Sequence, residues 1–267
     1  MEIEERVVVV TGAGSGIGRA LAKEFVSAGA RVVAADIDGG AAEATVAELA
    51  HGRARAAAVD TGTTDGIGTL IELARNDFGP VDIYVANAGV WGPTLLGDEE
   101  GWERTLHVNL LGHIRAAQQL MPDWQARSEG HFVSVASAAG LLTQPGGAAY
   151  AVTKHAAVAF AEWLAITYGD NGIGVTCVCP LGVNTPLLDA GRRVTDAAAR
   201  LAFQAVVNSG PVIEPQRVAE MTLDAVRTGT FMVLPHPEVA DMFSQRASDH
   251  DRWMAGMRHY QRSLAGG

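Results

Sequence analysis

Tyr150 and Lys154 lie four residues apart in a predicted helix, within the run YAVTK. This spacing places both side chains on one helical face, so the ammonium group can act on the phenol. A free phenol has a pKa near ~10, and a fixed positive charge close by favours its ionised form and would lower that pKa. Ser137, which closes a strand-like run, would hold a carbonyl or alcohol oxygen beside the phenol. The three residues indicate an acid/base centre, although Tyr and Lys at this spacing also occur by chance in many helices.

A glycine-rich turn follows the first strand-like run of the chain. Residues 6–18 read RVVVVTGAGSGIG, and residues 19–28 read as a helix. A strand, a glycine-rich loop and a helix in this order are typical of a dinucleotide site, where the backbone approaches a pyrophosphate at the positive end of the helix. A purely structural turn is the alternative for this pattern taken alone. The glycines follow TGxxxGxG and are Gly12, Gly14, Gly16 and Gly18.

Asp36 ends the second apolar strand, residues 31–35. An acidic side chain at this distance from the glycine turn accepts hydrogen bonds from the adenosine ribose hydroxyls of NAD and repels the 2′-phosphate of NADP. Ile37 and Asp38 follow, so no arginine stands there to receive a phosphate. We therefore expect NAD(H) as the cofactor, with a solvated loop aspartate as the alternative interpretation of Asp36.

Two further strands end in residues suited to a bound dinucleotide. Residues 56–60 form a predicted third strand, and Asp60 and Thr61 fall where the chain would pass the adenine. Residues 81–86 form a fourth, and small residues after it would let the backbone pass close under the cofactor, although a plain turn would look the same. The residues after this fourth strand are Asn87, Ala88 and Gly89.

Strands and helices continue to alternate along the chain. A helical region is predicted at residues 101–127, with Asn109 among apolar neighbours, where a buried amide must find partners. Further strands are predicted at residues 131–137, 175–179 and 231–234. The pattern predicts an α/β fold, a doubly wound, Rossmann-like parallel sheet of about seven strands, in one domain spanning residues 1–267.

The expected substrate pocket is apolar. Segment 184–213 is poorly patterned and is predicted to be a lid over the substrate, and residues 238–267 are predicted to form a helical tail. An apolar pocket gives affinity through buried area and discriminates little between similar shapes, so we expect hydrophobic secondary alcohols and their ketones, cyclic or aromatic. The residues expected to face the substrate are Trp91, Ser137, Ala139, Leu141, Leu142, Leu187 and Leu188.

Composition argues against several other classes of function. A formal net charge of −10 disfavours binding to nucleic acid or an anionic membrane. No signal-like segment opens the sequence, and no apolar run reaches the ~18 residues that span a bilayer. Cys177 and Cys179 are expected to point to opposite faces of a strand and to stay reduced, so we expect a cytoplasmic protein. The histidines show no ligand spacing, and no metal is expected.

Taken together, these pieces resemble the short-chain dehydrogenase/reductase family, in the form with a single Rossmann-like domain. The resemblance covers nearly the whole chain. Thr11–Gly18 matches the family's phosphate-binding turn, including Ser15 and Ile17. Two departures stand out: Ala86 precedes the NAG motif where a second asparagine is common, and Leu181 follows Pro180 where glycine is usual, close to the expected nicotinamide. Further matches are Asp60 for the adenine contact, Asn87–Gly89, the tetrad Asn109, Ser137, Tyr150 and Lys154, and Pro180, Val183 and Thr185.

The resemblance implies a hydride transfer between NAD(H) and a secondary alcohol or ketone. Tyr150 would take or return the hydroxyl proton, Ser137 would bind the same oxygen, Lys154 would hold the nicotinamide ribose, and Asn109 would support a water chain to solvent. Residues 151–168 are apolar nearly all round, which together with the family predicts self-association to a dimer or tetramer. Two alternatives remain: an NADPH-linked reductase of 3-oxoacyl thioesters, and a non-catalytic, cofactor-binding regulatory protein.

Overall fold

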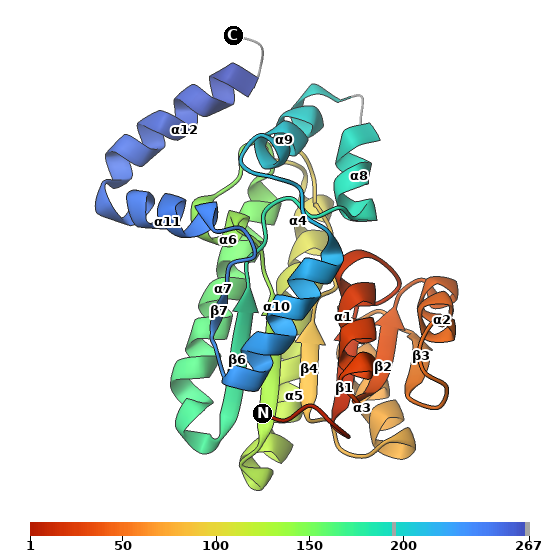
Figure 1. Cartoon of the computed structure of the whole chain (residues 1–267). Coiled ribbons are helices and arrows are strands. Elements are labelled where there is room, and N and C mark those ends of the chain that lie inside the picture. The colour runs from red at the N-terminus through yellow and green to blue at the C-terminus, as the bar shows by residue number, and fades with distance from the viewer. Residues whose placement is uncertain (194–195, 265–267) are drawn as a thin grey trace.

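The computed structural model describes residues 1–193 and 196–264. In these residues, seven parallel strands form one sheet in the order β3-β2-β1-β4-β5-β6-β7 (Figure 1). This confirms the doubly wound parallel sheet. The third strand lies two residues earlier than expected. The strands are β1 (Val7–Thr11), β2 (Arg31–Asp36), β3 (Ala54–Ala58), β4 (Ile83–Ala86), β5 (Gly130–Val135), β6 (Ile173–Val178) and β7 (Met232–Val233).

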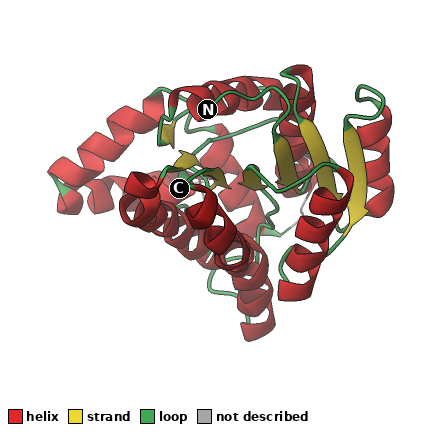
Figure 2. Cartoon of the chain, turned by 90° about the horizontal axis from the view of Figure 1, so that it is seen from below, coloured by secondary structure: helices red, strands yellow, loops and turns green. Residues whose placement is uncertain are grey.

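Helices cover both faces of this sheet (Figure 2). The first half of the chain contributes α1 (Gly16–Ser27), α2 (Gly39–Ala47), α3 (Thr64–Asp77), α4 (Glu99–Leu106), a π-helical turn (His107–Leu111) and α5 (Gly112–Arg127). The second half contributes α6 (Ala139–Leu142), α7 (Ala148–Tyr168), a 3₁₀ turn (Gly169–Asn171), α8 (Pro186–Arg193), α9 (Ala197–Val207), α10 (Pro215–Thr228), α11 (Glu238–Ser248) and α12 (His250–Leu264).

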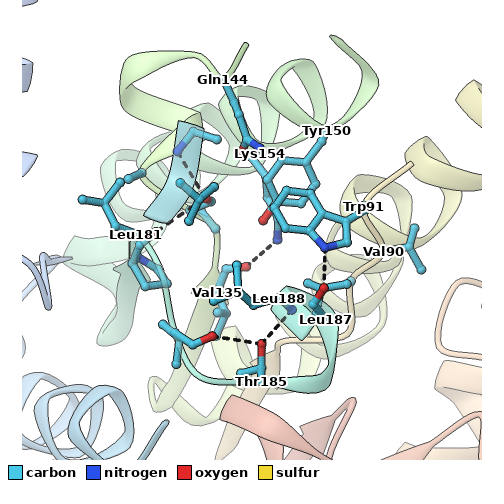
Figure 3. Close-up of a pocket in the computed structure, with 18 of the residues that line it drawn as sticks. Val90, Trp91, Val135, Gln144, Tyr150, Lys154, Leu181, Thr185, Leu187 and Leu188 are labelled. Carbon is cyan, nitrogen blue, oxygen red and sulfur yellow. Dashed lines mark hydrogen bonds between the residues drawn. The ribbon is translucent and has the colours of Figure 1, made fainter. Parts of the chain in front are cut away.

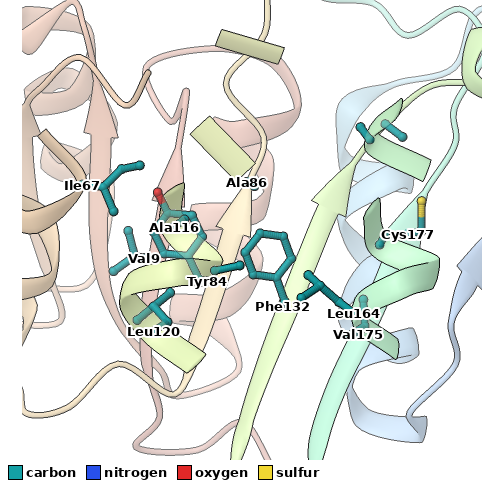
Figure 4. Close-up of a cluster of buried hydrophobic side chains, with 14 of the residues drawn as sticks. Val9, Ile67, Tyr84, Ala86, Ala116, Leu120, Phe132, Leu164, Val175 and Cys177 are labelled. Carbon is teal, nitrogen blue, oxygen red and sulfur yellow. The ribbon is translucent and has the colours of Figure 1, made fainter. Parts of the chain in front are cut away.

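The alternation of side chains along each buried strand builds two cores. In β1, Val7 and Val9 join a cluster with α3, α5 and α7, whereas Val8 and Val10 join a cluster with α1 and α10. The first cluster contains Tyr84 and Phe132, whose ring centroids lie 5.9 Å apart (Figure 4). Both faces of the sheet are therefore covered by apolar side chains, which explains why polar and apolar residues do not alternate along the sequence of β1.

The helical region expected at 101–127 is interrupted. α4 and α5 are joined by the π-helical turn, and Asn109 lies in that turn with no exposed surface. A π turn inserts one extra residue into a helix and is common at functional sites. The insertion accounts for a polar residue pointing inward from an otherwise apolar stretch.

The segment predicted to be an unpatterned lid contains two helices, α8 and α9. Asp196 caps α9 by accepting a hydrogen bond from the Ala199 amide at 2.9 Å. The tail forms α11 and α12, and α12 is tied to α9 because Tyr260 Oη donates to the Ala205 carbonyl at 3.0 Å. Residues 194–195 of the predicted lid and 265–267 of the predicted tail lie outside the described residues.

The prediction that the two cysteine side chains point to opposite faces of the strand was wrong. Cys177 and Cys179 are two residues apart, so they share one face of the strand, and their sulfur atoms lie 3.8 Å apart. Both are buried thiols without a disulfide. Among the described residues, no helix is long and apolar enough to cross a membrane.

Candidate active site

A cavity of about 730 Å³ lies where the strands of the sheet end at their carboxyl termini. This edge is where α/β sheets bind ligands, at the point where the strand order reverses between β1 and β4. The structure brings most of the predicted residues together here (Figure 3). The predicted residues that line the cavity are Gly12, Ser15, Gly16, Ile17, Asp36, Asp60, Thr61, Asn87, Ala88, Gly89, Trp91, Ser137, Ala139, Leu142, Tyr150, Lys154, Pro180, Val183, Thr185, Leu187 and Leu188.

Three predicted residues do not line the cavity. Gly18 packs α1 against the glycine turn, where a Cβ would lie 2.1 Å from the Gly12 carbonyl oxygen. Asn109 lies behind the wall, and Leu141 is buried in the core because α6 turns its side chain away from the cavity. The prediction of Leu141 as a pocket residue is therefore not supported by its position.

The glycine turn leaves the N-terminus of α1 open to a ligand. Ser15 is the N-cap residue, but its side chain makes no cap hydrogen bond, and the first turn carries no acidic residue. Gly12 and Gly16 have φ values of +64° and +52°, which favour glycine. Backbone N–H groups at a positive helix end bind anions, so this turn fits the pyrophosphate of a dinucleotide.

Thr11 connects the glycine turn to the NAG motif. The amides of Asn87 and Ala88 donate to Thr11 Oγ1 at 2.9 and 3.0 Å, and Asn87 Nδ2 donates to the Thr11 carbonyl at 2.8 Å. These bonds join the ends of β1 and β4. They hold the two loops side by side where both line the cavity.

Asp36 is held in place by the backbone around it. Its Oδ2 accepts from the Gly14 amide at 2.9 Å and its Oδ1 from the Asp38 amide at 3.0 Å. A Cβ on Gly14 would lie 2.8 Å from Oδ2, so this glycine is required for the approach. The fixed, half-buried carboxylate fits the two hydroxyls of an adenosine ribose and would repel a phosphate there.

Tyr150, Lys154 and Ser137 meet at the opposite end of the cavity. Lys154 Nζ donates to the Val135 carbonyl at 2.9 Å and lies 5.8 Å from the centroid of the Tyr150 ring (Figure 3). Burial lowers the pKa of Lys154 to about 8, so the ammonium form still prevails at neutral pH. An ammonium group has three donors, and those not used by Val135 are available to a ligand.

The pKa of Tyr150 moves in the direction opposite to the one expected. Burial raises this pKa in the chain alone, and the nearby Ser137 hydroxyl only partly opposes the effect. Desolvation of the phenolate is the largest cause of this rise. Ser137 Oγ accepts from the Ala139 amide at 3.1 Å and lies 3.5 Å from the Pro180 carbonyl oxygen, which is a weak contact.

Trp91 joins the Tyr150 end of the cavity to α8. Its ring centroid lies 4.8 Å from that of Tyr150, with 39° between the planes. Its indole N–H donates to the Leu187 carbonyl at 2.6 Å (Figure 3). The indole therefore forms a wall beside the phenol and links it to the first turn of α8.

Asn109 acts on the loop after β4. Its Oδ1 accepts from the Val90 amide at 2.8 Å, and its Nδ2 donates to the Val90 carbonyl at 2.9 Å and to Thr153 Oγ1 at 3.2 Å. The buried amide thus finds the partners that its sequence context required. It ties the loop that carries Trp91 to the helix that carries Tyr150.

Sequence reasoning missed a second group of cavity residues. They come from α9 and the turn after it, from α11 and α12, and from the loops before α7 and after β4. For α9, α11 and α12 the sequence predicted only a lid and a helical tail. Nothing in the sequence indicated that the tail covers the cavity. The missed residues include Val90, Gln144, Pro145, Ala205, Val206, Asn208, Ser209, Met242, Trp253, Met257 and Tyr260. Across the described chain, no three His, Cys, Asp or Glu side chains gather in a metal-binding cluster.

Comparison with known proteins gives consistent matches. The family model described as short chain dehydrogenase matches residues 6–194. A 1-deoxy-11-beta-hydroxypentalenate dehydrogenase of Streptomyces exfoliatus is 36% identical over 198 residues, 70% of this chain and 71% of that protein. A 3beta-hydroxysteroid dehydrogenase 1 of Eggerthella lenta is 31% identical over 82% of this chain and 85% of its own. A short chain dehydrogenase/reductase from Burkholderia phymatum, solved in complex with NAD, superposes with a TM-score of 0.84 at 30% identity, covering 94% of this chain and 96% of that one.

Proposed function

The chain belongs to the short-chain dehydrogenase family, and from that premise we propose that it is an NAD(H)-linked oxidoreductase of hydrophobic secondary alcohols and their ketones. The observation that carries the proposal is the convergence of two sets of residues on one cavity. The glycine turn and Asp36 lie at one end, and Ser137, Tyr150 and Lys154 lie at the other.

The cofactor would be held by groups already fixed in place. The open N-terminus of α1 would bind the pyrophosphate, Asp36 would accept hydrogen bonds from the adenosine ribose, and Asp60 and Thr61 would border the adenine. Bound there, the nicotinamide supplies the chemistry of accepting or giving a hydride. Lys154 would bind the nicotinamide ribose through the N–H groups that the Val135 carbonyl does not use.

The chain's own residues handle the proton and the substrate oxygen. Tyr150 takes the hydroxyl proton of the alcohol, or returns one to the ketone, and Ser137 donates a hydrogen bond to the same oxygen. Because burial raises the pKa of Tyr150 in the chain alone, the phenolate needs the positive charge of Lys154 and of the bound cofactor. Asn109 and the loop at Val90 support the path by which the proton reaches solvent.

The substrate class is supported by the wall opposite the cofactor. Trp91, Leu142, Leu187, Trp253 and Met257 make that wall predominantly apolar. The names of the matched hydroxypentalenate and hydroxysteroid dehydrogenases describe alcohols on large carbon skeletons, which supports the same class. Within this class we propose broad tolerance, since apolar pockets discriminate weakly between similar shapes.

Self-association and location are also part of the proposal. α7 exposes Val152, Trp163 and Ile166, with 50%, 52% and 84% of their surfaces accessible, on a helix whose other faces are buried. A second copy would cover this apolar surface, in a dimer or tetramer. We place the protein in the cytoplasm, as the reduced cysteines and acidic charge suggest.

The experiment is a turnover assay on the purified protein. NAD⁺ is mixed with a panel of cyclic, aromatic and polyol alcohols, and NADH absorbance is followed. We expect the highest kcat/KM for apolar secondary alcohols. A clear preference for sugars or other polyols, or no reduction of NAD⁺ by any alcohol in a protein that binds NADH, contradicts the proposal.

A further inference from the structure

His236 is a buried polar side chain that the proposed mechanism does not use. It lies just after β7 and has no exposed surface. Its Nδ1 accepts from the Leu181 amide at 3.1 Å, and its Nε2 faces the carbonyl oxygens of Gly182 and Pro211, each at 3.1 Å. Nδ1, which contacts a backbone N–H, must be an acceptor, and Nε2, which contacts carbonyl oxygens, must carry the proton. These partners select the neutral imidazole protonated at Nε2. Burial lowers the pKa of His236, which also favours the neutral form.

The Nδ1 contact orients one peptide group beside the catalytic serine. The N–H of Leu181 and the C=O of Pro180 belong to the same planar unit. While the N–H donates to His236, the Pro180 oxygen accepts from the Ala138 amide at 2.8 Å and lies 3.5 Å from Ser137 Oγ. A rotation of this peptide would therefore disturb the strand end that borders the expected nicotinamide and the loop that carries Ser137.

The Nε2 contacts hold a short clasp at the base of the segment that carries α8 and α9. Val183 and Ile213 form an isolated parallel bridge, in which the Ile213 amide donates to Gly182 O at 3.0 Å and the Asn184 amide donates to Ile213 O at 2.9 Å. His236 bonds to a carbonyl on each side of this clasp. The clasp fixes where the chain enters and leaves the substrate wall.

We infer that His236 is a positioning residue with two separable tasks: Nδ1 sets the Pro180–Leu181 peptide for the cofactor, and Nε2 sets the clasp that places the substrate wall. This rests on the proposed function. A purely structural role would lower stability without separating cofactor binding from substrate binding.

Two substitutions separate the tasks, because an asparagine oxygen can take the place of Nδ1 and a glutamine nitrogen the place of Nε2. For His236→Asn we expect NADH affinity, measured by fluorescence titration, within roughly twofold of wild type, and an alcohol KM raised roughly five- to tenfold. For His236→Gln we expect the reverse, a Kd for NADH raised roughly five- to tenfold and a smaller change in KM.

His131 supplies the matched control. It is also buried, it lies within β5 with its Nε2 2.9 Å from Thr176 Oγ1, and it does not line the cavity. His131→Asn should lower thermal stability and leave both the NADH Kd and the alcohol KM unchanged. The inference is overturned if the two His236 variants change both constants by equal factors, or change neither, while wild type binds NADH and turns over.

A measurement on the wild-type protein covers the case in which the variants do not fold. Nitrogen NMR of the imidazole side chains should show His236 protonated at Nε2 alone, with its signals shifted when NADH is added to saturation. The other tautomer, or signals that NADH leaves unmoved, overturns the inference. Failure of wild type itself to bind NADH refutes the proposed function instead, so the two failures are distinguishable.

Discussion

Replacement of Trp91 by phenylalanine isolates one hydrogen bond at the wall of the active site. The substitution keeps an aromatic ring beside Tyr150 and removes the N–H that donates to Leu187 O at 2.6 Å. A hydrogen bond of this kind contributes about 0.5–1.5 kcal/mol net, which corresponds to roughly two- to twelvefold in an equilibrium constant. Since the bond positions α8 and not the reacting oxygen, the loss should appear in the alcohol KM, with kcat within about twofold of wild type.

Trp91→Ala removes the ring as well as the bond. The lost packing against Tyr150 adds about 0.5–1.5 kcal/mol for the aromatic pair beyond its buried area, so KM should rise further and kcat should also fall. Trp102→Phe is the matched control, because Trp102 Nε1 donates to the Leu96 carbonyl at the same 2.6 Å but does not line the cavity. Steady-state kinetics of the three variants test the reasoning. Equal effects of Trp91→Phe and Trp102→Phe on KM would refute it.

Three further predictions concern the cofactor, acid stability and the tail. Wild type should bind NADH at least roughly tenfold tighter than NADPH, and Asp36→Ala should reduce that preference, because the fixed carboxylate repels the 2′-phosphate. If parallel titrations show that wild type binds NADH and NADPH equally, Asp36 does not select the cofactor. The free energy of unfolding should fall from pH 7 to pH 5, because burial lowers the pKa of His113 to about 3 and that of His131 to about 4. Below the unfolded-state pKa of ~6.5, these histidines take up protons in the unfolded chain but stay neutral in the folded one. Each residue should therefore cost about 2 kcal/mol of stability by pH 5. Urea titrations with the same free energy of unfolding at both pH values would contradict it. Tyr260→Phe loses the hydrogen bond to the Ala205 carbonyl and should raise the alcohol KM a few-fold, with the NADH Kd unchanged. A changed NADH Kd with an unchanged KM would contradict a position of Tyr260 over the substrate wall.

The sheet and the two ends of the cavity were predictable because their signals are local. Each signal is a pattern within a few residues: a β-branched run buried on both faces, a glycine turn with positive φ, and an Asp at the next strand end. Asn109 was also recognisable, since a buried amide needs partners and finds them in Val90 and Thr153. What the sequence could not indicate was the π turn that aims this amide inward.

The remaining parts of the site depend on contacts between distant segments. His236 gains its role only from three carbonyl and amide groups brought to it by β6 and the clasp. α12 reaches the cavity because Tyr260 packs on α9, a pairing that no periodicity encodes. Leu141, expected to face the substrate, is instead in the short helix α6, where it is buried in the core cluster and is not among the residues that line the cavity. The pKa of Tyr150 is raised by burial, which depends on the whole fold and which the spacing of Tyr150 and Lys154 in the sequence does not reveal.

The central claim is that Tyr150 transfers the proton in a cavity that independently binds NAD(H), and Tyr150→Phe tests it most directly. NADH titration and turnover of the best alcohol are measured on the same preparation of the variant. The account predicts an NADH Kd within roughly twofold of wild type and a kcat lowered by roughly 10²–10⁴, the usual contribution of a positioned acid/base. A variant that binds NADH normally and keeps most of its kcat would contradict it.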